Sequence, residues 1–326
     1  MRNPRTPPES NDPSVDEYIS IPDASVESMH PFDEPRSTLT ALRESYTRSL
    51  SRSVLAFEAN YRLNPDFVAT SPFSLVTAYN TPPPAGVLVQ CRVRRTRDFS
   101  AITRKYVYTM STDSGKAVMC SKRMSGTRSS YFTITGGPPK ALGDKTHHMY
   151  LGKLRSNFLG SLYTLFSPGE NPDKSSPANI DPVFRKELVS IRYESTLLRS
   201  VPTKKGPRHM SVAVPSKLFP TDYYSDPFAL RNATDNGIQP GIEIFYNKEP
   251  RWNNSVNGYV LKFSERVREP SVKNFQLVTN LDNTDICMQF GKIGENEYSL
   301  DFTTPFTPLA AFGIALSSLD FKLCCE

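Results

Sequence analysis

The feature that most constrains the fold is an apolar run that begins at Pro308 and extends through Leu316. A helix with this composition is apolar on every side, and such a helix lies either in a membrane or wholly enclosed by protein. The run is well short of the roughly 18 residues that span a bilayer. We therefore expect no transmembrane helix, and we expect other parts of the protein to enclose this one.

Upstream of that run, the chain has the texture of a β protein. Short β-rich runs alternate with polar, proline-containing turns, which is typical of a sandwich or a barrel. The predicted strands are residues 86–94, 104–110, 131–134, 159–166, 210–214, 242–246, 259–263 and 275–279. A closed sheet wrapped around the C-terminal helix would bury the helix on all sides and remove the edges of the sheet. Small residues in the helix would let the strands approach closely, namely Ala310, Ala311, Gly313 and Ala315.

The first part of the chain has a different composition. Residues 1–35 contain eight acidic residues, two arginines and seven prolines, so their net charge is −6 and the remainder carries +12. Few large apolar residues occur there, and we predict a disordered acidic tail over residues 1–36. Residues 37–71 are predicted to form an amphipathic helix and a linker, because apolar residues recur at spacings of three and four. This helix either packs on the neighbouring domain or recruits a protein partner.

No pattern in the sequence indicates an enzyme. The four histidines form no metal-binding motif, and a nucleophile elbow, a Walker loop and a dinucleotide fingerprint are all missing. The five cysteines are scattered without C-x-x-C pairs, so we expect reduced thiols and neither a zinc site nor another cofactor. The N-terminus lacks the apolar core of a signal peptide, and we expect an intracellular protein.

Three basic groups are candidates for binding phosphate. Side chains alternate between the two faces of a strand, so Lys153 and Arg155 should point outward together while Leu154 points into the core. A second group lies in a predicted turn at residues 204–209, and a third at residues 121–123. Mixed Lys and Arg side chains suit adjacent phosphates on a ring, because Arg offers a planar fork of donors and Lys a compact charge. The alternative is that these cations are simply solvated.

Several motifs resemble, in the same order, the signature sequences of the Tubby-like protein family. They are GKLRSN (152–157), KGPR (205–208), NKEPRWN (247–253), SVKNFQ (271–276), MQFGKIG (288–294) and AFGIALSSLDFKLCCE (311–326). They cover about residues 72–326, which we therefore predict to be a tubby C-terminal domain. The resemblance implies a mainly β fold, a closed twelve-stranded antiparallel barrel around a central hydrophobic C-terminal helix.

The resemblance also implies binding of phosphoinositides that carry adjacent phosphates, typically phosphatidylinositol 4,5-bisphosphate, without catalysis. The cations that contact phosphate in the family map onto Lys153, Arg155 and Arg208. A further contact, an asparagine in animal members, is replaced here by Ser130. The expected role is that of a cytoplasmic adaptor at the plasma membrane that links lipid to protein trafficking or signalling, with the nucleus and the cilium as further locations.

The alternative function is a DNA-binding transcription regulator that leaves the membrane when the lipid is hydrolysed. The net charge of +12 downstream of residue 35 permits contact with DNA. No recognition-helix motif supports base readout, so DNA is the weaker of the two predicted partners.

Overall fold

A computed structural model of the chain describes residues 79–98, 105–115, 117–124, 129–137, 150–172, 183–194, 209–216, 228–236, 240–255, 258–263, 265–279 and 285–320. The predicted acidic tail (1–36) and the predicted amphipathic helix and linker (37–71) lie outside these residues. Both therefore stay predictions, as do the domain boundaries drawn from them.

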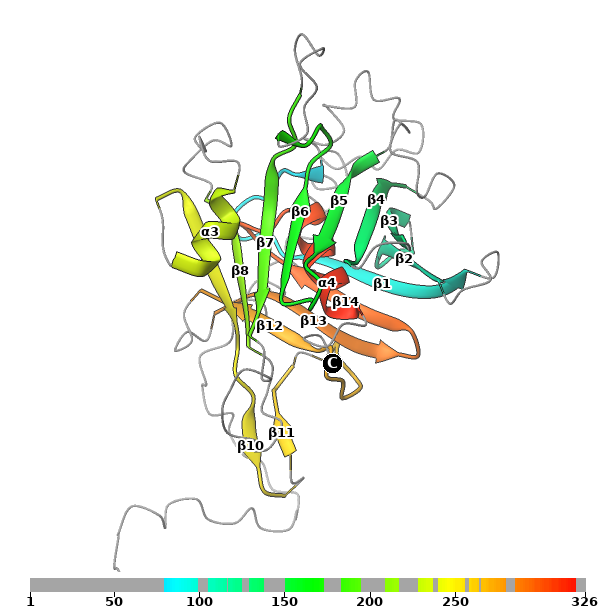
Figure 1. Cartoon of the computed structure of the whole chain (residues 1–326). Coiled ribbons are helices and arrows are strands. Elements are labelled where there is room, and N and C mark those ends of the chain that lie inside the picture. Colours follow the sequence, from blue (N-terminus) through cyan, green and yellow to red (C-terminus); the bar gives the residue numbers. More distant parts are fainter. Residues whose placement is uncertain are drawn as a thin grey trace, which may run out of the picture. The chain divides into compact units, whose positions relative to one another are not determined.

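Twelve antiparallel strands close into a barrel in the order β1-β14-β13-β12-β9-β8-β7-β6-β5-β4-β3-β2 (Figure 1). The barrel strands are β1 (Val89–Asp98), β2 (Lys105–Thr112), β3 (Ala117–Met124), β4 (Tyr131–Gly136), β5 (Tyr150–Ser156), β6 (Leu162–Phe166), β7 (Glu187–Tyr193), β8 (Met210–Pro215), β9 (Ile242–Asn247), β12 (Phe275–Val278), β13 (Ile286–Gly294) and β14 (Glu297–Phe302). Two further strands, β10 (Arg251–Asn253) and β11 (Gly258–Val260), form a separate two-stranded sheet. The prediction of a closed twelve-stranded barrel is confirmed.

The helix α4 (Pro308–Leu319) lies inside this barrel, and all of its residues are buried. Phe312 and Leu316 have no exposed surface, as expected for a helix that is apolar on every side. The helix begins at a favourable signal, because Pro308 is its first residue and the Thr307 hydroxyl accepts a hydrogen bond from the N–H of Ala310 at 3.0 Å. The composition of this one segment therefore predicts the centre of the fold correctly.

The small residues of α4 allow the close approach that the sequence predicts. A Cβ atom added to Gly313 would lie 3.1 Å from the Cδ2 atom of Leu165 on β6. The few polar side chains of the helix have partners inside the barrel: Ser317 donates to the carbonyl of Ile314 at 2.7 Å and shares a hydrogen bond with the hydroxyl of Tyr193 at 2.8 Å. These bonds offset the cost of enclosing hydroxyl groups in an apolar core.

A second helix, α3 (Ala229–Asn236), covers part of the outer face of β7 and β8 (Figure 1). This helix was not predicted from the sequence, because a helix of two turns has little stability of its own and depends on tertiary contacts. Here Leu230 and Ala233 pack against the outward side chains of Ala213 and Ile242. Its Arg231 guanidinium also donates to the buried carboxylate of Glu187 at 2.7 Å.

The predicted strands need correction in number and in bounds. Strands β3, β5, β7, β10, β13 and β14 were not among the eight predicted runs, although β5 was treated as a strand when Lys153 and Arg155 were placed on one face. The run 159–166 was placed too early: β6 begins at Leu162, because Gly160 has a φ of +76° and Leu159 lies in the preceding turn. The run 86–94 was likewise placed too early: β1 begins at Val89, after the turn at Gly86, whose φ is +80°. The run 259–263 overlaps only β11, which lies outside the barrel sheet.

Within the described part of the chain, neither helix is long and apolar enough to cross a bilayer.

Candidate phosphate-binding site

Strand β5 carries the two outward cations, and a bulge sets which of its residues face the core. Opposite it on β4, Ile134 pairs with Gly152, but the next pair along joins Thr135 to Tyr150, so Leu151 is an extra residue. Gly152 has a φ of +147°, in a region that favours glycine. A Cβ atom there would lie 2.2 Å from a carbonyl oxygen of β6, so only glycine fits.

The bulge changes the alternation of faces along β5. Leu151 and Leu154 are both fully buried although they are three residues apart. Beyond the bulge, Lys153 is half-buried and Arg155 is exposed, on either side of Leu154. The prediction that the two cations share the outward face is therefore confirmed. Two residues along a strand separate their Cα atoms by about 7 Å.

The register extends this outward row onto β3. Thr133 on β4 pairs with Lys153 on one side and with Lys122 on the other, and opposed residues place their side chains on the same face. Lys122 therefore lies on the same face as Lys153, about 10 Å away across two strand spacings. Its ammonium group is 2.6 Å from the carboxylate of Asp98, which neutralises part of the charge. Sequence spacing alone could not detect this neighbour, because β3 is distant in sequence and its register was unknown.

Arg123, which follows Lys122 on β3, has its side chain on the inner face of the barrel. It pairs with Phe132, which is fully buried in the core, so its side chain enters the end of the barrel. Its guanidinium lies 3.1 Å from the carboxylate of Asp320, the fully buried residue that follows α4, and donates to the Ser130 hydroxyl at 2.8 Å. The hydroxyl of Tyr163 donates to the same carboxylate at 2.9 Å. Arg123 therefore lies across the end of the barrel at which α4 ends. We call this end of the barrel the Asp320 end.

Ser130, predicted as a phosphate contact, is nearly enclosed by protein. Its hydroxyl accepts the bond from Arg123, and its backbone N–H and carbonyl bond to the side chain and the N–H of Ser156 at 3.0 and 2.9 Å. Ser130 immediately precedes Tyr131, which is opposed to Arg155. Ser130 thus lies next to Arg155 along the backbone and joins β4 to β5 there, but its hydroxyl is directed to Arg123 and not to the outward face. Its contact with a ligand stays a prediction.

Arg208 and the two lysines of its basic group lie outside the described residues. The chain re-enters the described part at His209, whose carbonyl accepts a bond from the N–H of Glu194 at 3.0 Å. The next residues of the two strands, Tyr193 and Met210, form the last pair of β7 and β8 at the Asp320 end. His209 itself has its Nδ1 atom 3.4 Å from the carboxylate of Glu249.

The titratable thiols and phenols of the barrel have the properties of core residues. Burial raises the pKa of Cys120 to about 11, that of Cys287 to about 11 and that of Tyr150 to about 12. These groups are therefore neutral near pH 7, unlike an activated nucleophile, whose pKa is lowered. The described ranges also contain no group of three His, Cys, Asp or Glu residues arranged to hold a metal ion.

Comparison with known proteins adds to this geometry. The model of the Tub family matches residues 79–321, which include the whole barrel and the enclosed helix. The chain belongs to the Tub family. Tubby-related protein 1 of Mus musculus is 33% identical over 256 residues, and the match covers 75% of this chain and 45% of the relative. Tubby-related protein 3 of Mus musculus is 35% identical over 258 residues, covering 76% of this chain and 54% of the relative.

A similar relation holds outside mammals. Protein king tubby 1 of Aedes aegypti is 33% identical over 259 residues, which are 75% of this Tub family chain and 59% of that relative. The chain thus matches about half the length of these curated relatives.

Proposed function

We propose that this Tub family protein binds phosphoinositides with adjacent phosphates, above all phosphatidylinositol 4,5-bisphosphate, and that it acts as an adaptor at the cytoplasmic face of the plasma membrane. The observation that carries the proposal is the outward pair Lys153 and Arg155 at one end of the barrel. One guanidinium fork and one ammonium group, about 7 Å apart along a strand, suit two phosphates on one ring.

The surroundings of this pair support a ligand that is itself anionic. Lys153 is opposed by Thr133 and Phe166 across the two neighbouring strands, and these side chains carry no charge. Arg155 is likewise opposed by two uncharged residues, Tyr131 and Thr164. On β1, by contrast, the exposed Arg94 is opposed by Glu297 and forms an ion pair with it. A cation with an opposed carboxylate has less charge to offer a phosphate.

Arg208 and Ser130 complete the proposed site. Arg208 would bring a second guanidinium from the segment between β7 and β8, whose described ends lie at the Asp320 end. Ser130 would act beside Arg155, either by direct contact or by holding Arg123 in place. A protein partner would bind through residues 37–71, which leaves the barrel to bind the lipid.

Vesicle sedimentation tests the proposal. The double variant Lys153→Ala/Arg155→Ala should lose most of its binding to vesicles that contain phosphatidylinositol 4,5-bisphosphate. At about 1 kcal/mol per cation near an anionic surface, the loss is roughly 30-fold in affinity. The matched control is Arg92→Ala/Arg94→Ala, a pair of exposed arginines with the same spacing on β1. Equal binding by the wild type and the β5 variant would overturn the assignment.

The same assay separates lipid recognition from binding to nucleic acid. Soluble inositol trisphosphate should compete with the vesicles, because a shaped site recognises phosphate geometry. A diffuse basic surface that binds DNA would instead lose affinity steeply with salt, by about 0.9 log units per log unit of salt for each phosphate neutralised. Binding to DNA that ignores the headgroup and the β5 variant would favour the transcription regulator.

A further inference from the structure

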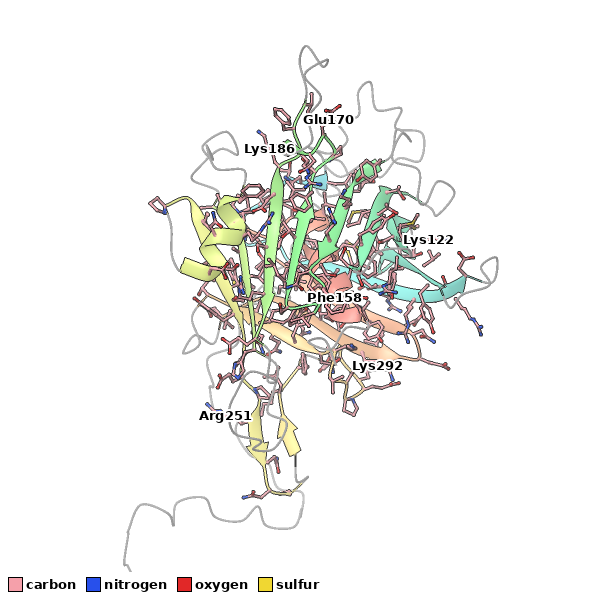
Figure 2. The ribbon with its side chains drawn as sticks, in the orientation of Figure 1. Lys122, Phe158, Glu170, Lys186, Arg251 and Lys292 are labelled. Carbon is pink, nitrogen blue, oxygen red and sulfur yellow. The ribbon has the colours of Figure 1, made fainter. Side chains whose placement is uncertain are left out.

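The turn between β5 and β6 exposes two large apolar side chains next to the proposed lipid site. Phe158 is 66% exposed and Leu159 is 44% exposed. Exposed apolar patches that are bordered by polar or charged residues mark sites of interaction with proteins or membranes. Figure 2 labels Phe158 at one end of β5 and β6, with Glu170 and Lys186 near the other end.

Hydrogen bonds hold this turn in one conformation. The Asn157 side-chain oxygen accepts bonds from the backbone N–H groups of Gly160, Ser161 and Leu162 at 2.8, 2.9 and 3.3 Å. The amide nitrogen of Asn157 donates to the Ser161 hydroxyl at 2.7 Å. Gly160 permits the tight turn with a φ of +76°. The exposure of the two apolar side chains is thus a property of the folded loop, and little conformational entropy is lost when the loop meets a partner.

The turn between β5 and β6 lies close to the outward cations Lys153 and Arg155. Phe158 follows Arg155 by three residues, so their Cα atoms are at most about 10 Å apart. A third exposed apolar residue, Val272, is 73% exposed and belongs to a loop at the same end of the barrel. That loop contacts the last turn of α4, because the carbonyl of Lys273 accepts a bond from the Ser318 hydroxyl at 3.3 Å.

We propose that Phe158 and Leu159 insert into the boundary between headgroups and acyl chains of the anionic membrane that carries the phosphoinositide; this inference rests on the proposed function. Side chains that bind at a membrane surface are buried about 5–10 Å into this boundary. Arg155 and Lys153 then lie behind the inserted tip, at the level of the headgroup phosphates. The cations beside the apolar tip favour a bilayer over a protein partner, because the bilayer surface offers anionic groups directly above an apolar layer.

The first experiment compares vesicle binding with headgroup binding for the full chain. The variant Phe158→Ser/Leu159→Ser should bind phosphatidylinositol 4,5-bisphosphate vesicles on the order of tenfold more weakly than the wild type. Its affinity for soluble inositol trisphosphate, measured by calorimetry, should be unchanged. The matched control is Val183→Ser/Phe184→Ser. These side chains are 67% and 42% exposed, and they precede the start of β7, at the end of the barrel away from Phe158. This control should bind vesicles as the wild type does.

The outcomes separate the insertion from the proposed function. If the loop variant binds vesicles as tightly as the wild type, the insertion is wrong and headgroup recognition stands. If it loses the soluble headgroup as well, the loop belongs to the phosphate site and the insertion is again wrong. If the wild type binds neither the vesicles nor the headgroup, the proposed function fails and the insertion fails with it.

A fluorescence measurement tests insertion itself. The chain has one tryptophan, Trp252, so Trp252→Phe provides a background without indole emission. On that background, the emission of Phe158→Trp should shift to shorter wavelength with vesicles and be quenched by lipids brominated on the acyl chain. Val183→Trp should show neither effect. The proposal would be overturned if the emission of Phe158→Trp stayed as it is in water while the protein was bound to vesicles. The exposed loop would then be free to bind a protein partner instead.

Discussion

Replacing Phe312 by alanine tests the claim that the barrel is built around its C-terminal helix. Phe312 has no exposed surface and belongs to the main core cluster. Large-to-small changes of buried aromatic residues cost about 3–5 kcal/mol, because both the transfer free energy and the packing around the cavity are lost. A loss of about 4 kcal/mol lowers the Tm of a domain of this size by about 8–16 °C.

The matched control is the same substitution on the surface. Phe158→Ala removes an equal number of atoms from a side chain that is 66% exposed, so its free energy of unfolding should change by less than about 0.5 kcal/mol. Urea denaturation of the wild type and both variants, followed by circular dichroism, measures the difference. Equal losses in the two variants, or a wild-type midpoint for Phe312→Ala, would refute the account of the core.

Three further changes test local parts of the barrel. Gly152→Ala puts a Cβ atom 2.2 Å from a backbone oxygen and should lower the free energy of unfolding by more than about 3 kcal/mol. Gly115→Ala, also at positive φ but with no atom within 4 Å, should lower it by about 1 kcal/mol, and urea denaturation of both variants measures the difference. Arg123→Met leaves the buried carboxylate of Asp320 without its cation and should cost about 3–5 kcal/mol, more than Asp320→Asn, and equal midpoints would contradict this ion pair. Burial raises the pKa of Cys120 to about 11, so its alkylation at pH 8, followed by mass spectrometry, should be much slower than that of a free thiol. Because the folded protein favours the neutral thiol, the free energy of unfolding should fall as pH rises from about 9 through about 11.

The enclosed helix was predictable because its composition leaves few options. A segment with apolar groups on every side, too short for a bilayer, must be surrounded by protein, and a closed sheet is the simplest way to surround it. The outward direction of Lys153 and Arg155 was predictable for a similar reason, since alternation along a strand depends only on the positions of neighbouring residues.

Other features depend on contacts between distant parts of the chain. The extra residue Leu151 and the glycine beside it follow from the register of β4 and β5, which no local pattern reveals. The basic run 121–123 reads as one cluster in sequence, yet Lys122 lies outside the barrel and Arg123 reaches Asp320 inside it. The helix α3 is too short to be stable alone, and its apolar face becomes visible only against β8 and β9.

A crystal structure of the protein with soluble inositol 1,4,5-trisphosphate would test directly whether Lys153 and Arg155 bind the phosphoinositide headgroup. We expect the two adjacent ring phosphates to lie within hydrogen-bond distance of the Lys153 ammonium and the Arg155 guanidinium, on the outer face of β5. Crystals of the variant Lys153→Ala/Arg155→Ala, grown with the same ligand, should hold no headgroup at this position. A headgroup bound to other residues, or an empty β5 surface at saturating ligand, would contradict phosphoinositide binding by Lys153 and Arg155.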